Sequence, residues 1–279
     1  MPKSQCLMPN EMNILDKIIE HKHKEVAERK SLYPVKLLEQ SIFFSSPTVS
    51  LKKYIQRKDK SGIIAEIKRK SPSKGIINSS VSVERTSIGY MQAGASALSI
   101  LTDKEFFGGS NDDLTIARKF NFCPILRKDF TVDEYQIIEA KSIGADAILL
   151  IAAALAPKRL AELASAAKGL GLEVLLEVHN KEELDANLNA NVDLIGVNNR
   201  DLKTFTLSLY VSKQLAEFIP KGIVRVSESG IESPEAIIEL KKFGYEGFLM
   251  GQNFMQHSRP EEAAKDFIKE LNRLEMNTL

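Results

Sequence analysis

Glu66 and Lys68 are two charged residues in the otherwise apolar, isoleucine-rich segment Ile63–Lys68. Such a segment predicts a buried strand, and side chains at positions i and i+2 point to the same face of a strand. Burying a carboxylate and an ammonium is costly unless the two groups pair or meet a ligand. A structural ion pair is one interpretation. Proline cannot extend a sheet ladder, so the strand ends at the loop Ser71-Pro72-Ser73. Charged groups at the end of a core strand favour a catalytic site there.

The elements that would position this pair are eight short β-rich runs that alternate with helical stretches from residue 62 onward. This alternation predicts parallel strands joined by helical crossovers, and eight such units fit a closed (β/α)8, or TIM, barrel of the α/β class. An open doubly wound sheet is the alternative, but no GxGxxG motif follows any run. The runs are Ile63–Lys68, Ala97–Leu101, Pro124–Lys128, Ala147–Ile151, Leu172–Glu177, Leu194–Asn198, Ile223–Val226 and Gly247–Met250.

Helix starts between the runs carry capping signals. Thr131, Asn180 and Ser258 are each followed three residues later by glutamate, which is the pattern of a capping box. Ser233-Pro234 places a proline at a first helical position.

The first 61 residues do not follow the strand–helix alternation. An apolar stripe predicts a helix from about residue 13 to 29, with Lys22-His23-Lys24 on its solvated face. Two shorter helices are expected at Val35–Glu39 and Leu51–Arg57. Because this segment has too few apolar residues to fold alone, we expect residues 1–61 to be a helical extension packed on the barrel, 62–279, with 1–279 forming a single domain. The stripe consists of Ile14, Leu15, Ile18, Ile19 and Val26.

Polar and ionisable residues stand at most of the predicted strand ends. In a (β/α)8 barrel the active site lies at the C-terminal ends of the strands, so we expect these side chains to meet in one cavity. The candidate catalytic residues are Glu66, Lys68, Lys128, Glu177, Asn198 and Ser229, and the candidate substrate-binding residues are Ser71, Pro72, Ser73, Phe130 and Arg200.

The last two strand ends predict a phosphate site. Ser229 and Gly230 follow the seventh strand, and Gly251 and Gln252 follow the eighth. Glycine allows a phosphate to approach backbone N–H groups closely, and TIM barrels frequently bind phosphate in these two loops. The alternative is that the glycines only permit tight turns.

Composition excludes several classes of function. The chain has 279 residues and a formal net charge of +1, which favours neither nucleic acid nor an anionic membrane as partner. No run of apolar residues approaches the length of a membrane span.

The cysteines and histidines do not indicate a metal site. Cys6 and Cys123 have no metal-binding spacing, and with only these two cysteines we expect a reduced, cytoplasmic protein. Glu177 and His179 lack a supporting cluster of histidine or cysteine, so no metal is expected, and His179 is expected to support its loop.

Four segments together resemble the indole-3-glycerol phosphate synthase family of tryptophan biosynthesis. The resemblance spans about residues 10 to 272 and includes the helical extension. One departure is Gln252, where the family tends to have a small or acidic residue, so a side-chain hydroxyl contact to phosphate is lost there. The segments are 64–73 (IAEIKRKSPS), 124–130 (PILRKDF), 195–202 (IGVNNRDL) and 227–231 (SESGI).

The resemblance implies the substrate, 1-(2-carboxyphenylamino)-1-deoxyribulose 5-phosphate, which closes to an indole with loss of carbon dioxide and water and without a cofactor. Lys128 resembles the family's general acid, and Glu177 matches the base that removes the proton from the ring nitrogen. The resemblance implies that Lys68 holds the substrate carboxylate and shares the acid work. Glu66 and Asn198 would position the lysines and the hydroxyls of the ribulose chain, and Arg200 would complete the polar network. Phe130 and Pro72 would face the aromatic ring, and Ser229, Gly230, Gly251 and Gln252 would hold the phosphate.

Three other functions fit parts of the pattern. A Schiff-base aldolase would use a strand-end lysine such as Lys128 as a nucleophile. A sugar-phosphate isomerase of the same pathway would not require so many lysine and glutamate side chains. A barrel that binds a phosphorylated ligand without turnover is disfavoured, because Lys128 and Glu177 are both present. We expect a monomer, with a weak dimer as the alternative.

Overall fold

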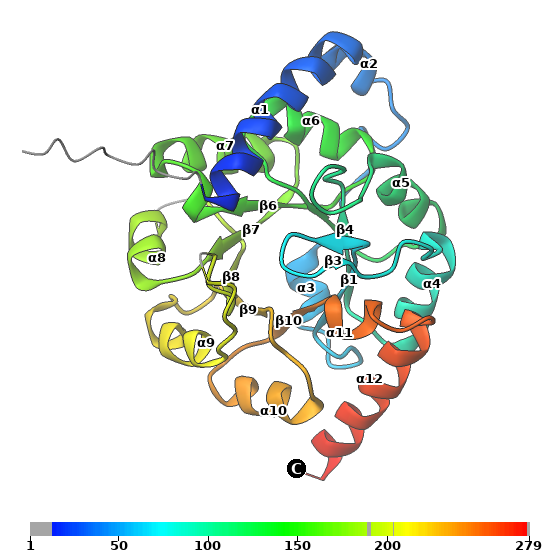
Figure 1. The fold of residues 1–279 in the computed structure, drawn as a ribbon, viewed down its shortest axis with the longest axis vertical. Coiled ribbons are helices and arrows are strands. Elements are labelled where there is room, and N and C mark those ends of the chain that lie inside the picture. The colour runs from blue at the N-terminus through cyan, green and yellow to red at the C-terminus, as the bar shows by residue number, and fades with distance from the viewer. Residues whose placement is uncertain (1–12, 189–190, 203, 278–279) are drawn as a thin grey trace, which may run out of the picture.

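The computed structural model describes residues 13–188, 191–202 and 204–277 and contains a closed eight-stranded parallel barrel (Figure 1). The predicted (β/α)8 barrel is therefore confirmed. Several strand boundaries differ from the prediction by one or two residues. The largest difference is at the seventh strand, where the ladder continues to Glu228, opposite Asn198. In barrel order the strands are β1 (Ile63–Ile67), β10 (Gly247–Met250), β9 (Val224–Glu228), β8 (Leu194–Asn198), β7 (Glu173–Val178), β6 (Ala147–Ile151), β5 (Ile125–Lys128) and β4 (Ala97–Leu101).

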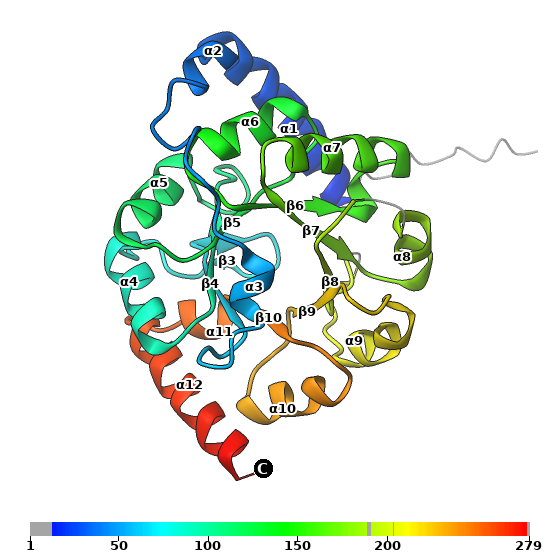
Figure 2. The same ribbon diagram turned by 180° about the vertical axis from the view of Figure 1, so that it is seen from behind.

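Helices surround the barrel, as Figures 1 and 2 show from its two ends. A short hairpin, β2 (Lys70–Ser71) and β3 (Gly75–Ile76), follows β1. No helix of the described residues is both long and apolar enough to cross a membrane. The helices after β1 are α4 (Val83–Ala93), α5 (Asn111–Phe120), α6 (Glu134–Ser142), η1 (Ala152–Ala154), α7 (Pro157–Gly169), α8 (Lys181–Asn187), α9 (Tyr210–Leu215), η2 (Ala216–Phe218), α10 (Pro234–Lys242), α11 (Gln252–Met255) and α12 (Pro260–Met276).

Strand alternation decides which side chains enter the barrel. In β1, Ile63, Ala65 and Ile67 pack outward in the large core between strands and helices. Ile64 packs instead in the core inside the barrel. Because side chains alternate along a strand, Glu66 follows Ile64 inward. The last inward residues of β1, β5, β7, β8 and β9 are, by the same rule, Glu66, Lys128, Glu177, Asn198 and Glu228.

Three helices precede the barrel: α1 (Ile14–Leu32), α2 (Val35–Leu38) and α3 (Leu51–Ile55). Leu51 and Ile55 of α3 belong to the core inside the barrel, so α3 closes the N-terminal end of the strands (Figure 2). Helix α1 instead packs beside α6 and η1 and reaches toward the opposite end. It ends three residues later than predicted, at Leu32. Lys22, expected on its solvated face, is fully buried.

The capping predictions were right where the side chain reaches a free amide. Asn180 caps α8, although Glu183 accepts from the backbone amide of His179 and not from that of Asn180, so the predicted box is incomplete. Ser233 caps α10, with Pro234 at the first helical position. The predicted capping boxes at Thr131 and Ser258 were wrong. Helix α6 starts two residues later, where Asp133 and Gln136 form the box, and α12 starts after Arg259 with no side-chain cap.

Candidate active site

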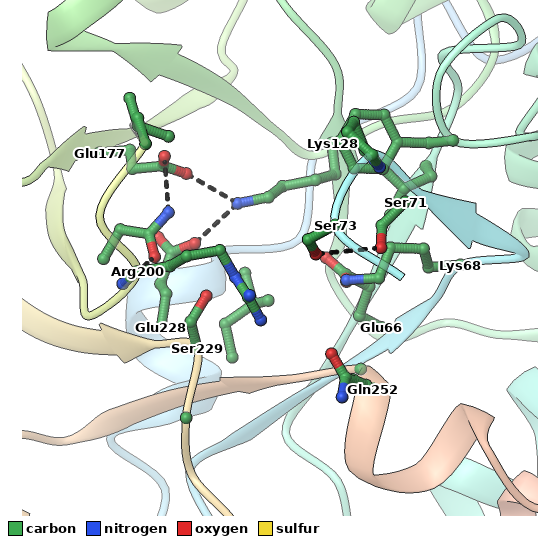
Figure 3. Close-up of a pocket in the computed structure, with 18 of the residues that line it drawn as sticks. Glu66, Lys68, Ser71, Ser73, Lys128, Glu177, Arg200, Glu228, Ser229 and Gln252 are labelled. Carbon is green, nitrogen blue, oxygen red and sulfur yellow. Dashed lines mark hydrogen bonds and ion pairs between the residues drawn. The ribbon is translucent and has the colours of Figure 1, made fainter. Parts of the chain in front are cut away.

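A cavity of about 520 Å³ opens at the C-terminal ends of the barrel strands. Its polar side chains point toward one another from opposite sides of the barrel (Figure 3). All of the site residues predicted from the sequence line this cavity: Glu66, Lys68, Ser71, Pro72, Ser73, Lys128, Phe130, Glu177, Asn198, Arg200, Ser229, Gly230, Gly251 and Gln252.

Lys128 lies between two carboxylates. Its Nζ donates to Glu177 Oε2 at 3.0 Å and to Glu228 Oε2 at 2.6 Å. Burial lowers the pKa of Lys128, but attraction to Glu177, Glu228 and Glu66 outweighs burial and holds that pKa well above its ordinary value. The amine is therefore a charged proton donor held at the centre of the cavity.

Glu177 is held in its ionised form. Burial raises its pKa, but the charge of Lys128, with contributions from His179 and Asn198, lowers it to about 2. Asn198 Nδ2 donates to Glu177 Oε1 at 3.0 Å. His179 Nε2 lies 3.4 Å from the same oxygen, and His179 Nδ1 lies 3.1 Å from Glu183 Oε2. The position of His179 agrees with its expected support of the loop and adds a basic group beside Glu177.

Glu228 belongs to this cluster but is not among the site residues predicted from the sequence. Burial raises its pKa, Lys128 opposes this and Glu177 adds to it, and the result is a pKa of about 7. Its Oε1 is buried with no hydrogen-bond partner among the described residues. A Cβ at Gly196 would overlap that oxygen, so glycine on β8 leaves room for the carboxyl group. The alternation Val224, Val226, Glu228 in β9 was a signal that could have found it.

Glu66 and Lys68, expected to share one face of their strand, pair with each other at the cavity. Lys68 Nζ lies 2.7 Å from Glu66 Oε1, and Ser99 Oγ donates weakly to Glu66 Oε2 at 3.4 Å. A Cβ at Gly251 would lie 2.5 Å from Glu66 Oε1, so only glycine fits beside this carboxylate. The Lys68 side chain is 18% exposed and that of Glu66 is 3% exposed, so the ammonium faces the cavity.

The loop after β1 forms one rim of the cavity. Ser71 and Ser73 carry hydroxyls 3.4 Å apart at the start of the β2–β3 hairpin. The hairpin is anchored from behind, because Arg69 binds Asp113 of α5 through both terminal nitrogens, at 2.5 and 3.0 Å. This anchoring directs the serines, with Pro72, toward the cavity.

The loops after β9 and β10 offer backbone amides. Ser229 and Gly230 both have positive φ, 66° and 73°. Gly251 precedes α11, and the first N–H groups of a helix have no partner within it. Arg200 lies on the adjoining rim, where burial lowers its pKa. These loops present donors to an anion at one end of the cavity.

The opposite part of the cavity is apolar. Phe130 and Phe107 lie with ring centroids 5.8 Å apart, and both line the cavity. Ile14, Leu15 and Ile18 of α1 line it as well. The sequence does not predict a site role for these α1 residues, because no local pattern shows where a helical extension docks.

No group of three or more histidine, cysteine, aspartate or glutamate side chains within the described ranges has the geometry to hold a metal ion. Cys123 is buried, as expected of a small core residue, and burial raises the pKa of its thiol to about 12. Cys6 lies outside the described residues.

Several known proteins similar in sequence to this chain belong to one family. The family model described as "Indole-3-glycerol phosphate synthase" matches residues 15–267. A relative of that name from Bacteroides thetaiotaomicron is 48% identical over 257 residues, covering 92% of this chain and 98% of the relative. Relatives of the same name from Thermoanaerobacter pseudethanolicus and Acinetobacter baylyi are 42% and 39% identical, covering 92% and 90% of this chain and 98% and 93% of their own.

A solved structure titled "Native KDPGal structure" has a TM-score of 0.57 and 15% identity, covering 80% of this chain and 98% of that chain. At this identity the likeness concerns the fold alone.

Proposed function

The chain belongs to the indole-3-glycerol phosphate synthase family, carboxy-lyases of tryptophan biosynthesis, and from that premise we propose how its cavity carries out the reaction. The substrate is 1-(2-carboxyphenylamino)-1-deoxyribulose 5-phosphate. The ring carbon that bears the carboxylate attacks the ketone carbon, carbon dioxide leaves, and water is then lost to give indole-3-glycerol phosphate.

Lys128 acts as the general acid for ring closure. As the new carbon–carbon bond forms, the ketone oxygen gains negative charge and takes a proton from the Lys128 ammonium. Support for this role comes from Glu177 and Glu228, which keep the amine protonated at 3.0 and 2.6 Å. This carboxylate–lysine–carboxylate cluster is the observation that carries the proposal.

Glu177 acts as the general base for dehydration and accepts the proton of the ring nitrogen, while Lys68, which shares the acid work, donates a proton to the leaving hydroxyl so that water departs. Its pKa of about 2 belongs to a carboxylate beside a charged lysine. Once Lys128 has given its proton to the substrate, that charge is gone and Glu177 becomes a stronger base. The acid step thus prepares the base for the next one.

The rest of the cavity binds the two ends of the substrate. Ser229, Gly230, Gly251 and Gln252 hold the phosphate, and Gln252 contributes its backbone amide in place of a hydroxyl. Lys68, held by Glu66, meets the substrate carboxylate and shares the acid work. Asn198 and Arg200 bind the ribulose hydroxyls, with Ser71 and Ser73 at the rim. Phe130 and Pro72 contact the aromatic ring, where excluding water strengthens the surrounding charges.

We propose that the extension and the barrel act as one unit, 1–279, in the cytoplasm. The enzyme works as a monomer and needs no cofactor, because ring closure is driven by positioning and proton transfer alone.

A Schiff-base aldolase is the second enzyme class to test. A lysine attacks a carbonyl as a neutral amine, and the carboxylates beside Lys128 oppose that form. Borohydride added to enzyme and substrate should therefore trap no covalent adduct. A trapped adduct on Lys128 would favour the aldolase.

Turnover tests the assigned roles directly. Indole fluorescence should rise when the purified protein meets the anilino-ribulose phosphate. Lys128→Ala should reduce kcat by about 10²- to 10⁴-fold with little change in substrate affinity, and Glu177→Gln should also lower kcat while leaving the fold intact. Lys24→Ala, at an exposed position of α1, is the control and should behave like the native enzyme. An unchanged kcat in Lys128→Ala would remove that residue as the acid.

A further inference from the structure

Lys22 of helix α1 is a buried lysine at the junction of the helical extension and the barrel. Its side chain has no exposed surface, and its Nζ lies 2.9 Å from each of three carboxylates, those of Asp103, Asp129 and Glu25. Asp103 follows β4 and Asp129 follows β5. One ammonium therefore joins α1 to two neighbouring strand ends at the mouth of the barrel.

The two aspartates hold the loops that carry the aromatic side chains of the cavity. Asp103 Oδ1 accepts hydrogen bonds from the amides of Phe106 and Phe107 at 2.7 and 3.2 Å. Asp129 Oδ1 accepts from the amide of Phe130 at 2.8 Å. Phe107 and Phe130 both line the cavity.

Lys22 lies on the same face of α1 as the apolar residues that line the cavity. Ile18, Leu15 and Ile14 stand four, seven and eight positions before it, so all four residues share one stripe of the helix. The three apolar residues line the cavity, and Lys22 meets the strand ends one turn further along. The ion cluster thus lies one helical turn from the apolar residues that line the cavity.

We infer that Lys22 is a positioning residue for the reaction. It holds the apolar stripe of α1 and the loops of Phe107 and Phe130 together as one wall against the aryl group of the substrate. The inference rests on the proposed function, because it takes this cavity as the substrate site. Asp129 directly follows Lys128, so the same contact also steadies the strand end that carries the acid.

The charges explain why a neutral residue would not serve at position 22. Asp103 has no exposed surface, and Lys22 is the only basic side chain within 4.0 Å of it among the described residues. Asp129 keeps a second cation, Arg127, whose Nη2 lies 3.4 Å from Asp129 Oδ2. Without Lys22 the two buried carboxylates repel each other, and a buried charge without its partner is strongly destabilising. The Asp103 loop, which carries Phe107, is the part that would move.

The test compares Lys22→Met and Lys22→Arg with Lys30→Met. Lys30 lies on the same helix, and its half-exposed side chain pairs with Asp133 at 2.8 Å outside the cavity. KM, kcat and inhibition by inorganic phosphate are measured at a temperature where circular dichroism shows each variant folded. For Lys22→Met we expect KM for the aryl substrate to rise about tenfold or more. Inhibition by phosphate should stay within about twofold of native, because phosphate binds at the other end of the cavity.

Lys22→Arg keeps the charge and should recover part of the affinity, whereas Lys30→Met should match the native enzyme. If Lys22→Met does not fold, the double variant Lys22→Met/Asp103→Asn removes the unpaired carboxylate and should show the same rise in KM. Native KM in a folded neutral variant would overturn the inference. Equal loss of substrate and phosphate binding would overturn it as well, since it would indicate general loosening.

Failure of the inference differs from failure of the proposed function. If the native enzyme turned over the substrate while the Lys22 variants kept native kinetics, only the positioning role would fall. If the native enzyme formed no indole product, the proposed function itself would fall.

Discussion

At the scale of single residues, two carboxyl groups that share one lysine differ widely in pKa. Glu177 and Glu228 both contact Lys128. The pKa of Glu177 is lowered to about 2, because Asn198 and His179 assist Lys128 there against burial. The pKa of Glu228 is raised to about 7, because burial and repulsion from Glu177 and Glu66 outweigh the attraction of Lys128. Two such groups suit proton transfer in opposite directions near neutral pH.

Glu228 predicts a pH dependence of stability. Its ordinary pKa of 4.5 is raised in the fold to about 7, so between these values the folded protein binds more protons than the unfolded chain. The stabilisation is fully present below pH 4.5 and is lost as the pH rises through 7. Glu228→Gln should lack this loss. Urea midpoints at pH 5 and pH 8, compared between native and variant, check it, and the same pH slope in both would contradict it.

Replacing Ser229 by glycine should separate the effect of its backbone conformation on stability from the effect of its hydroxyl on phosphate binding. Its φ of 66° is a conformation that glycine adopts without strain. Ser229→Gly should therefore keep its stability within about 1 kcal/mol of native. Loss of the hydroxyl should weaken phosphate binding by about tenfold, since hydrogen bonds to charged groups contribute about 1.5–3 kcal/mol. Inhibition by inorganic phosphate measures the second effect, and Ser31→Gly, on the exposed part of α1, is its control. Unchanged inhibition would remove the hydroxyl from the phosphate site.

At the scale of elements, the two ends of the barrel carry different tasks. The inward residues near the N-terminal ends of the strands are apolar and pack with α3. Those at the C-terminal ends are Glu66, Lys128, Glu177, Asn198 and Glu228, which line the cavity. Helix α3 is itself held to β7, since Ser50 and the amide of Lys52 donate to the two oxygens of Glu173 at 2.5 and 2.8 Å. Mutations near the N-terminal ends of the strands should therefore change stability, and mutations at the C-terminal ends should change catalysis.

Leu51 tests this separation. It is fully buried in the core inside the barrel. Leu51→Ala should lower the free energy of unfolding by about 2–5 kcal/mol, because it leaves a cavity there. At 25 °C its kcat and KM should stay native, since α3 lies at the end away from the site. Leu32→Ala, at an exposed position, is the control for stability. A fall in kcat of the folded Leu51→Ala variant would contradict the separation.

At the scale of the whole molecule, the N-terminal extension reaches both ends of the barrel. Helix α3 closes one end, while α1 supplies apolar side chains and Lys22 at the other. Arg29 fixes the far end of α1, with its Nε 2.5 Å from Glu139 Oε1 of α6. Because the cavity draws on both parts of the chain, we expect the extension and barrel to act together.

The molecule's chemistry predicts independence from metal ions. No cluster of ligating side chains was found among the described residues, and the proposed steps need only proton transfer and positioning. Treatment with EDTA should leave the rate of indole formation unchanged. The assay compares rates before and after chelation and again after excess magnesium. A rate that falls with EDTA and returns with magnesium would contradict the cofactor-free reaction.

The amino-acid sequence by itself determined the barrel and the strand ends that carry polar groups. Both rest on local periodicity, because alternation along a strand fixes which side chains point inward. The same alternation places Glu228 of β9 inward, although Glu228 is not among the site residues predicted from the sequence. The Glu66–Lys68 pair followed from a spacing of two residues and is present at 2.7 Å.

Only the tertiary structure decided what lies opposite each of these groups. Which carboxylates meet Lys128 depends on closure of the barrel, which brings β5, β7 and β9 around one space. Lys22 looked solvated because a lysine on a helix surface is usually exposed. Its burial depends on two aspartates more than 80 residues away. Periodicity reports the face a side chain occupies, whereas pairing and burial depend on the segment that packs against that face.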